Sequence, residues 1–228
     1  MMRQLEGKIQ GLQERLLLMG RLAESMLQTA LRVLIERNGA LGAEVERMEH
    51  EVNELQIEID DTAVKLTALQ QPVGGDVRFL FMASRIATEL ERIADQAVNI
   101  IENAQHLLKA PALKPLVDLP VMGEIAEGMV KDSLQSLVAR ECALANRVFE
   151  EEKKVDAYRD QIFRVLLTYM MADPGTIERA LALILISRNL ERVGDHATNI
   201  AEEVIYLVEG REVRHSHESD TRRPEAEA

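Results

Sequence analysis

The chain has 228 residues and 46% of them are hydrophobic, which is enough to bury the core of one or two domains. Its formal net charge of −12 argues against nucleic acid as a partner, because surfaces that bind nucleic acid are basic. The single cysteine, Cys142, excludes a disulfide framework and is typical of a reducing compartment. We expect Cys142 to be a small core residue rather than a reactive thiol.

Neither a signal peptide nor a membrane-spanning helix is expected. The first residues alternate between charged and apolar side chains, and no stretch of about 18 uncharged apolar residues occurs. We therefore expect a soluble protein of the cytoplasm.

The apolar pattern predicts six long helices with few breaking residues inside them. Residues 111–120 contain three prolines and are expected to form a linker, and the polar residues 211–228 are expected to form a disordered tail. Short turns between long helices force antiparallel neighbours. The predicted helices span residues 4–36, 41–70, 76–108, 121–140, 143–171 and 175–210.

The chain contains two tandem copies of one sequence unit. Residues 90–100, LERIADQAVNI, recur 100 positions later as LERVGDHATNI, and further upstream the copies align at an offset of 103, as for Leu31 with Leu134. Repetition at a fixed period indicates that both copies fold as the same unit. We therefore predict an all-α fold, a tandem repeat of two antiparallel three-helix bundles, with domains at residues 1–110 and 121–210.

Each predicted third helix carries two acids four residues apart, a spacing that places both carboxylates on one helix face. The acids lie one residue after apolar core positions, so they should flank the core on a partly exposed face. The two stripes are Glu91, Asp95 and Asn99 in copy one, and Glu191, Asp195 and Asn199 in copy two.

The second helix of each copy carries a pair of residues that matches the two acids of the third helix. Both pairs lie a similar number of residues from the turn that joins the two helices. In copy two the pair is Glu152 and Asp156, and in copy one it is Glu49 and Asn53. Similar counts along an antiparallel hairpin give similar heights, so each pair should face the acids of the third helix. Four carboxylates at one level repel one another and favour the binding of a proton or a cation.

Carboxylate and amide oxygens favour hard cations, so we expect clusters of iron, manganese, magnesium or calcium, with zinc as a further candidate. Copy one should bind its cation more weakly, because Asn53 replaces an acid. His196 points about 100° away from Asp195, so we expect it to have a packing or surface role. The alternative to metal binding is a solvated face with salt bridges to Arg92, Arg188, Arg192, Lys153 or Lys154.

The paired motifs resemble those of the PhoU family of bacterial phosphate-signalling regulators. The resemblance covers about residues 10–215 and includes QPV at residues 71–73 and IYLVEG at residues 205–210. It implies a negative regulator of the phosphate-starvation response and of phosphate uptake, which links the ATPase of the Pst phosphate transporter to the sensor kinase PhoR. It also implies a homodimer, peripheral contact with the inner membrane, and metal clusters bound through the paired acids.

Two other functions stay open at this point. A carboxylate-bridged di-iron enzyme built in a helical bundle uses Glu-x-x-His motifs, but none of Glu91, Glu152 and Glu191 is followed by histidine three residues later. A purely structural helical scaffold would use its acids only for solvation. Because no Ser–His–Asp or Cys–His arrangement emerges from the sequence, we predict that the protein is not an enzyme.

Overall fold

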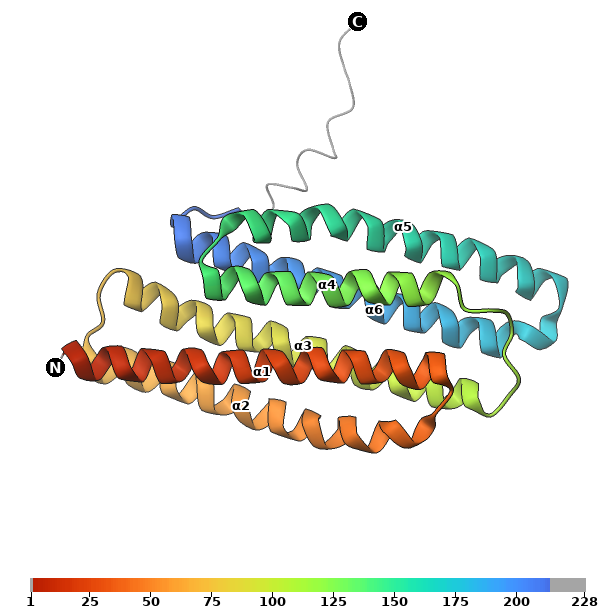
Figure 1. Ribbon diagram of the computed structural model, residues 1–228, viewed down its shortest axis with the longest axis horizontal. Coiled ribbons are helices and arrows are strands. Elements are labelled where there is room, and N and C mark those ends of the chain that lie inside the picture. The colour runs from red at the N-terminus through yellow and green to blue at the C-terminus, as the bar shows by residue number, and fades with distance from the viewer. Residues whose placement is uncertain (1, 214–228) are drawn as a thin grey trace, which may run out of the picture.

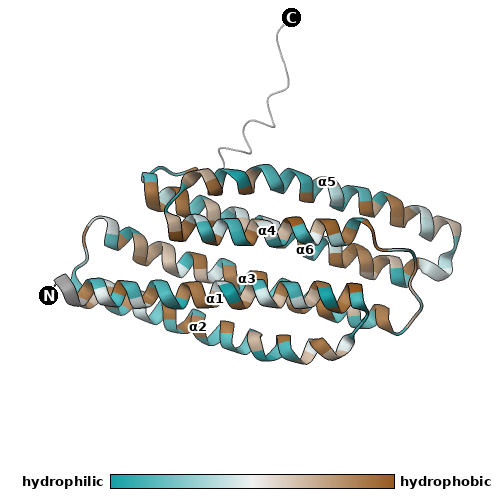
Figure 2. Cartoon of the chain, viewed as in Figure 1, coloured by the Kyte–Doolittle hydropathy of each residue, from teal (hydrophilic) through white to brown (hydrophobic). Residues whose placement is uncertain are grey.

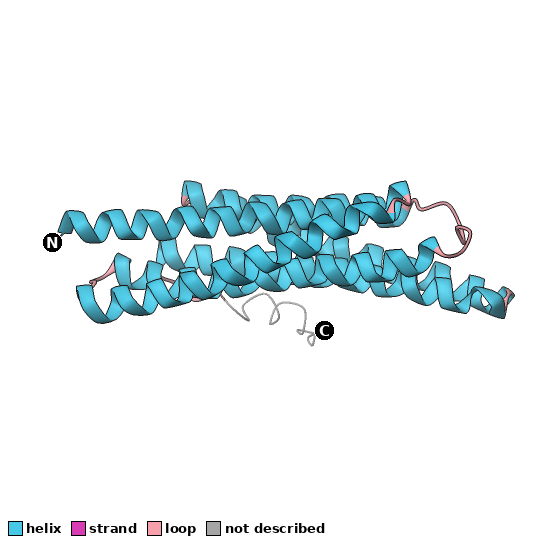
Figure 3. Ribbon diagram, turned by 90° about the horizontal axis from the view of Figure 1, so that it is seen from below, coloured by secondary structure: helices cyan, strands magenta, loops and turns pink. Residues whose placement is uncertain are grey.

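The computed structural model describes residues 2–213, and all regular structure within this range is helical (Figure 3). None of the helices in this range is long and apolar enough to cross a membrane. The elements in chain order are α1 (Met2–Glu36), the 3₁₀ turn η1 (Gly39–Leu41), α2 (Gly42–Gln70), α3 (Gly75–Leu108), α4 (Asp118–Ala139), α5 (Cys142–Ala172), the 3₁₀ turn η2 (Pro174–Thr176) and α6 (Ile177–Glu209).

The helices form two three-helix bundles that lie against each other (Figure 1). Helices α1 to α3 pack together, as do α4 to α6, and the most extensive contact between the bundles joins α3 to α6. These two helices are antiparallel. Arg78 donates to the carbonyl of Leu207 over 3.2 Å near one end of the contact, and His106 approaches Glu178 to 2.8 Å near the other. The predicted all-α tandem fold is confirmed.

One continuous core runs through both bundles. The apolar stripes predicted on the third helices lie in it, and Leu90, Ile93, Leu190 and Val193 are all fully buried. Hydrophilic residues are spread along the outer helices α2 and α5 (Figure 2). The core therefore fixes the rotation of α3 and α6, and with it the direction in which their acids point.

Helices α1 and α4 also touch, through one glycine–leucine contact that occurs twice. A Cβ atom at Gly20 of α1 would lie 2.8 Å from the Leu134 side chain of α4, and a Cβ atom at Gly123 of α4 would lie 2.6 Å from the Leu31 side chain of α1. Both residues of the first contact map onto those of the second at the offset of 103 found in the sequence. Glycine lets the two helices approach closely at both places, because a larger side chain would force the facing leucine to shift.

The predicted linker at residues 111–120 is wrong at its C-terminal end, because α4 already begins at Asp118. Pro120 is accommodated in the first turn of α4, where a backbone N–H has no partner inside the helix. The start of α6 also differs from the prediction, since η2 precedes it and Asp173 accepts a hydrogen bond from the Gly175 amide over 2.9 Å. Most of the predicted tail, from residue 214 on, lies outside the described residues.

Candidate metal centre

The acids of copy two lie on the facing sides of α5 and α6. Val155 and Val193 are buried in the core and set the rotation of the two helices. Glu152 precedes Val155 by about one helical turn, and Asp195 follows Val193 by two residues. The carboxylates of Glu152 and Asp195 consequently lie close enough to perturb each other.

The pKa of Glu152 is raised to about 7. The largest cause is burial, which disfavours the charged form, and the carboxylates of Asp195, Asp156 and Glu202 add to it, while the Thr198 hydroxyl opposes the shift. The pKa of Asp195 is also raised, first by loss of hydration and then by Glu191 and Asp156. In copy two, burial and neighbouring carboxylates thus both disfavour the charged forms of Glu152 and Asp195.

Arg159 of α5 contacts two of the predicted ligands, Asp156 and Glu191. Its guanidinium forms a hydrogen-bonded ion pair with Glu191 of α6, lies 3.3 Å from Asp156 and lies 2.9 Å from Asp160. The Arg159 side chain is 30% exposed, so it is held in the groove between the helices rather than in open solvent. One side chain therefore bridges the acids of α5 and α6.

Copy one has a similar arrangement with one carboxylate fewer. Burial raises the pKa of Glu91, and the carboxylates of Asp95 and Glu49 add to the shift. Loss of hydration also raises the pKa of Asp95. Asn53 is half-buried on α2, one turn after Glu49. The structure thus brings the acids of α2 and α3 near one another, as it does those of α5 and α6.

The two asparagines of the predicted stripes behave differently. The Asn199 side chain turns towards the other repeat and donates to Glu89 of α3 over 2.9 Å. The Asn99 side chain is half-buried, and the backbone carbonyl of Asn99 accepts a hydrogen bond from Asn103 over 2.7 Å. Asn199 is therefore engaged in joining the repeats.

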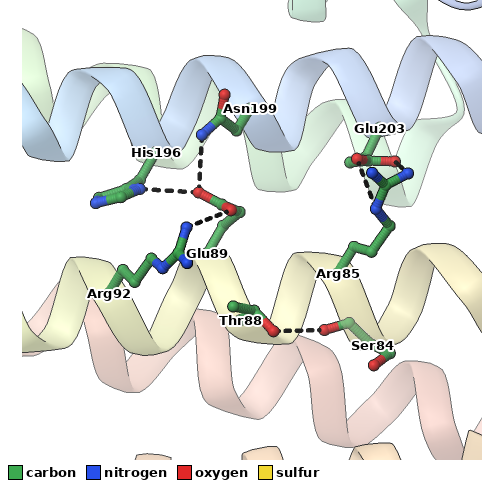
Figure 4. Close-up of polar contacts among 8 residues, drawn as sticks. All are labelled: Ser84, Arg85, Thr88, Glu89, Arg92, His196, Asn199 and Glu203. Carbon is green, nitrogen blue, oxygen red and sulfur yellow. Dashed lines mark hydrogen bonds and ion pairs between the residues drawn. The ribbon is translucent and has the colours of Figure 1, made fainter.

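Glu89 is the centre of a polar cluster between α3 and α6 (Figure 4). His196 Nδ1 lies 2.8 Å from the Glu89 carboxylate, and Arg92 approaches the same group to 3.2 Å. Burial alone would raise the pKa of Glu89, but the hydrogen bonds from His196 and Asn199 outweigh it and lower the pKa. His196 thus contacts Glu89 across the interface between the repeats.

The donor set of copy two suits a hard cation in its chemistry, because carboxylate oxygens are the ligands that such cations prefer. Burial and the carboxylates of Asp195 and Asp156 disfavour the charged form of Glu152, which a bound cation would stabilise. Within the described residues, however, no three acidic, histidine or cysteine side chains converge closely enough to hold a metal ion. Glu191 and Asp156 are instead turned onto Arg159. The predicted metal ligands therefore remain a prediction.

Sequence reasoning missed two of the residues that organise these acids. It considered five other basic residues as salt-bridge partners but not Arg159, and it did not single out Glu89. The signal for Arg159 lay in the repeat itself, because Gln56 occupies the matching place in copy one at the offset of 103. Cys142 is half-buried against the core, and burial raises the pKa of its thiol, which suits a packing role.

Comparison with known proteins agrees with this architecture. The PhoU domain model matches the chain twice, over residues 16–104 and 119–204. The chain belongs to the PhoU family. It is 38% identical over 203 residues to the phosphate-specific transport system accessory protein PhoU homolog of Zymomonas mobilis, an alignment that covers 89% of this chain and 86% of that protein.

Solved structures of the family share the fold. The crystal structure of PhoU from Pseudomonas aeruginosa superposes with a TM-score of 0.87 at 34% identity and covers 90% of this chain and 99% of that one. The curated homolog from Aquifex aeolicus is 36% identical over 204 residues, which is 90% of this chain and 92% of that protein. The chain therefore spans nearly the whole length of its PhoU relatives.

Proposed function

We propose that this PhoU-family protein is an accessory component of a phosphate-specific transport system and a negative regulator of the phosphate-starvation response. The observation that carries the proposal is the match of two PhoU domains along most of the chain, together with relatives named as accessory proteins of phosphate-specific transport. In this role the protein restrains phosphate uptake and starvation genes while phosphate is plentiful.

The partners in this proposal are the ATPase of the Pst transporter and the sensor kinase PhoR. The protein would act in the cytoplasm as a homodimer, in peripheral contact with the inner membrane. Its net charge of −12 favours docking on basic surfaces, where complementary charge speeds encounter more than it tightens binding. Added salt should therefore slow association with the partners.

Deletion of the gene in the bacterium that encodes it tests the regulatory proposal. Alkaline phosphatase activity should rise in medium rich in phosphate, because restraint on the starvation genes is lost. A deletion strain that keeps its phosphatase low in high phosphate, and carries no second PhoU gene, would contradict the proposal.

We also propose that the paired acids bind a divalent or trivalent cation, more tightly in copy two than in copy one. The ligands are Glu152, Asp156, Glu191 and Asp195 in copy two, and Glu49, Asn53, Glu91 and Asp95 in copy one. A bound cation would neutralise the acids and strengthen the contact of α5 with α6 and of α2 with α3. The raised pKa of Glu152 supports this assignment, since a cation would stabilise the charged carboxylate that burial and the neighbouring acids disfavour.

Replacing Glu191 and Asp195 with alanine should lower the metal bound to protein purified without chelators, as measured by mass spectrometry. The matched control replaces Glu124 and Glu141, two exposed acids away from the groove, and should leave the metal content unchanged. Equal metal in both double variants and the wild type would place the metal elsewhere.

The role proposed here requires no catalysis. A di-iron oxidase of the helical-bundle type is the competing activity, and oxygen consumption after addition of ferrous iron distinguishes it. A rate above that of free iron, abolished by replacement of Glu191 and Asp195, would favour the enzyme.

A further inference from the structure

A cavity lies beneath the segment that joins the two repeats. This segment runs from the end of α3 to the start of α4 at one end of the molecule (Figure 1). The cavity has a volume of about 260 Å³ and lies between residues 111–116 and the helices that they cover. Leu34 of α1, Leu107 of α3 and Leu183 of α6 all line it. Both repeats therefore contribute to the wall of one cavity.

The wall of this cavity is apolar apart from two cations. Among the described residues that line it, Arg37 and Lys114 are the polar ones, and none is an acid. This is the reverse of the average for the chain, whose net charge is −12. Cavities that bind small molecules are mostly apolar, contain a few polar groups that orient the ligand, and often lie where two domains meet.

Lys114 has an unusually poor set of partners for a lysine with so little exposure. Its side chain is 13% exposed, and its Nζ lies 3.7 Å from Asp118 Oδ2, which is longer than a hydrogen bond. The other oxygen of Asp118 accepts a hydrogen bond from Gln161 over 3.1 Å. No acceptor in residues 2–213 lies within hydrogen-bond distance of the ammonium. Three N–H donors beside the cavity are thus left for an acceptor from elsewhere.

Arg37 supplies the second positive charge. It follows the last residue of α1, and its Nη2 donates to the carbonyl of Leu107 over 3.2 Å and to that of Ala110 over 2.6 Å. These bonds attach the end of α3 and the start of the joining segment to α1. No carboxylate pairs with Arg37 in the described part of the chain, so its charge is not neutralised by the protein.

We propose that this cavity binds a medium-chain carboxylate, with its aliphatic chain among the leucines and its carboxylate on Lys114. At about 30 Å³ for each water-sized group, a volume of about 260 Å³ accommodates about nine non-hydrogen atoms, which is close to the size of octanoate. A carboxylate provides the acceptors that Lys114 lacks, and hydrogen bonds between charged partners are strong. The inference is independent of the proposed cation binding, because none of the paired acids lines the cavity.

A carboxylate bound here joins the two repeats. Its chain contacts α1 and α3 of the first repeat and Leu183 of the second, while its charged end holds the joining segment through Lys114. A ligand that binds only the folded protein stabilises it by mass action. Binding should therefore strengthen the association of the repeats at the end of the molecule where the joining segment lies.

Isothermal titration calorimetry of the full chain near neutral pH compares octanoate with octylammonium, which has the same chain and the opposite charge. The net negative charge of the protein favours octylammonium, so a preference for octanoate has to come from the site itself. Wild-type protein should bind octanoate at least about tenfold more tightly than octylammonium, because the carboxylate alone pairs with Lys114.

Lys114→Gln should weaken octanoate binding at least about tenfold and octylammonium binding less than about threefold. A general distortion of the joining segment would weaken both ligands alike. Lys109→Gln is the matched control, since Lys109 is an exposed lysine next to the same segment that does not line the cavity. Its loss should change the affinity for octanoate less than about threefold.

Methyl nuclear magnetic resonance locates the bound octanoate. The δ1 methyl of Ile35, identified by its loss in Ile35→Val, should shift as octanoate is added, because Ile35 lines the cavity. Ile57 of α2 is the control, since it is exposed like Ile35 but does not line the cavity. Its methyl, identified in Ile57→Val, should not shift. Thermal melts followed by circular dichroism verify that each variant is folded.

Folded wild-type protein that binds no octanoate overturns the proposal. Equal weakening of octanoate binding by Lys114→Gln and Lys109→Gln also overturns it, since general charge then explains the effect. An Ile57 methyl that shifts as much as that of Ile35 has the same meaning, because octanoate then adsorbs on exposed apolar surface. Weakening confined to octanoate and to Lys114→Gln, with the shift confined to Ile35, supports the proposal.

Discussion

Glu152 should destabilise the metal-free protein near neutral pH, and replacing it with glutamine should relieve this. Its pKa in the folded protein is about 7, against an ordinary value of 4.5, because burial and the neighbouring carboxylates disfavour its charged form. A raised folded pKa contributes stability that is fully present below pH 4.5 and is lost as the pH rises through about 7. Glutamine resembles the protonated acid and has no such pH dependence.

The size of the effect follows from the shift. At about 1.4 kcal/mol per pKa unit, the full shift corresponds to about 3 kcal/mol. Glu152 is only half-buried, so solvent screening reduces this to about 1–2 kcal/mol. Relative to the wild type, Glu152→Gln should therefore gain about 1–2 kcal/mol of unfolding free energy between pH 4.5 and pH 8.

Urea denaturation in the presence of EDTA measures this difference at several pH values. Glu150→Gln, at an exposed position of the same helix, controls for the loss of one negative charge. Wild type and Glu152→Gln that differ by a constant amount from pH 4.5 to pH 8 would refute the crowding of acids in copy two. Added Mn²⁺ should make the wild type more stable than Glu152→Gln at pH 8, because only the wild type keeps the Glu152 carboxylate as a metal ligand.

Three further outcomes follow from the contacts between the repeats. Glu89→Gln should lower the free energy of unfolding by about 1–3 kcal/mol, since it leaves His196 without its charged partner, and an unchanged urea midpoint would contradict this. The loss should shrink as the pH falls below 4.5, because a carboxylate with a lowered folded pKa contributes its full stability above that value and loses it progressively below. Gly20→Val should lower the free energy of unfolding by about 1–3 kcal/mol, because the valine collides with Leu134. Adding Leu134→Ala to the same chain should recover part of that loss. Strictly additive effects of the two substitutions on the free energy of unfolding would refute the contact.

Much of the fold follows from the sequence because two periodicities reinforce each other. The 3.6-residue apolar pattern defines the long helices, and the repeat shows that the same pattern is used twice. Leu90 and Leu190 occupy equivalent core positions for this reason. The sequence pattern places the start of α4 too late, because Pro120 resembles a helix breaker although a proline is tolerated in a first turn.

The polar contacts were harder to predict because they depend on how neighbouring helices are rotated. Arg159 lies three residues after Asp156, and the sequence alone does not reveal that it also reaches Glu191 on another helix. The contact of His196 with Glu89 joins residues 107 positions apart and depends on the packing of α3 on α6. Comparing the charges of the two copies would have found Arg159, whereas nothing in the sequence points to Glu89.

Complementation is the decisive test of the proposal that the chain restrains phosphate-starvation genes. A strain that lacks the gene receives either the wild-type gene or an empty vector, and alkaline phosphatase is measured in high phosphate. The wild-type gene should return the phosphatase to a low level, while the empty vector should leave it high. Equal phosphatase in the two strains, with the protein present at normal abundance, would contradict the assignment of this chain as a negative regulator.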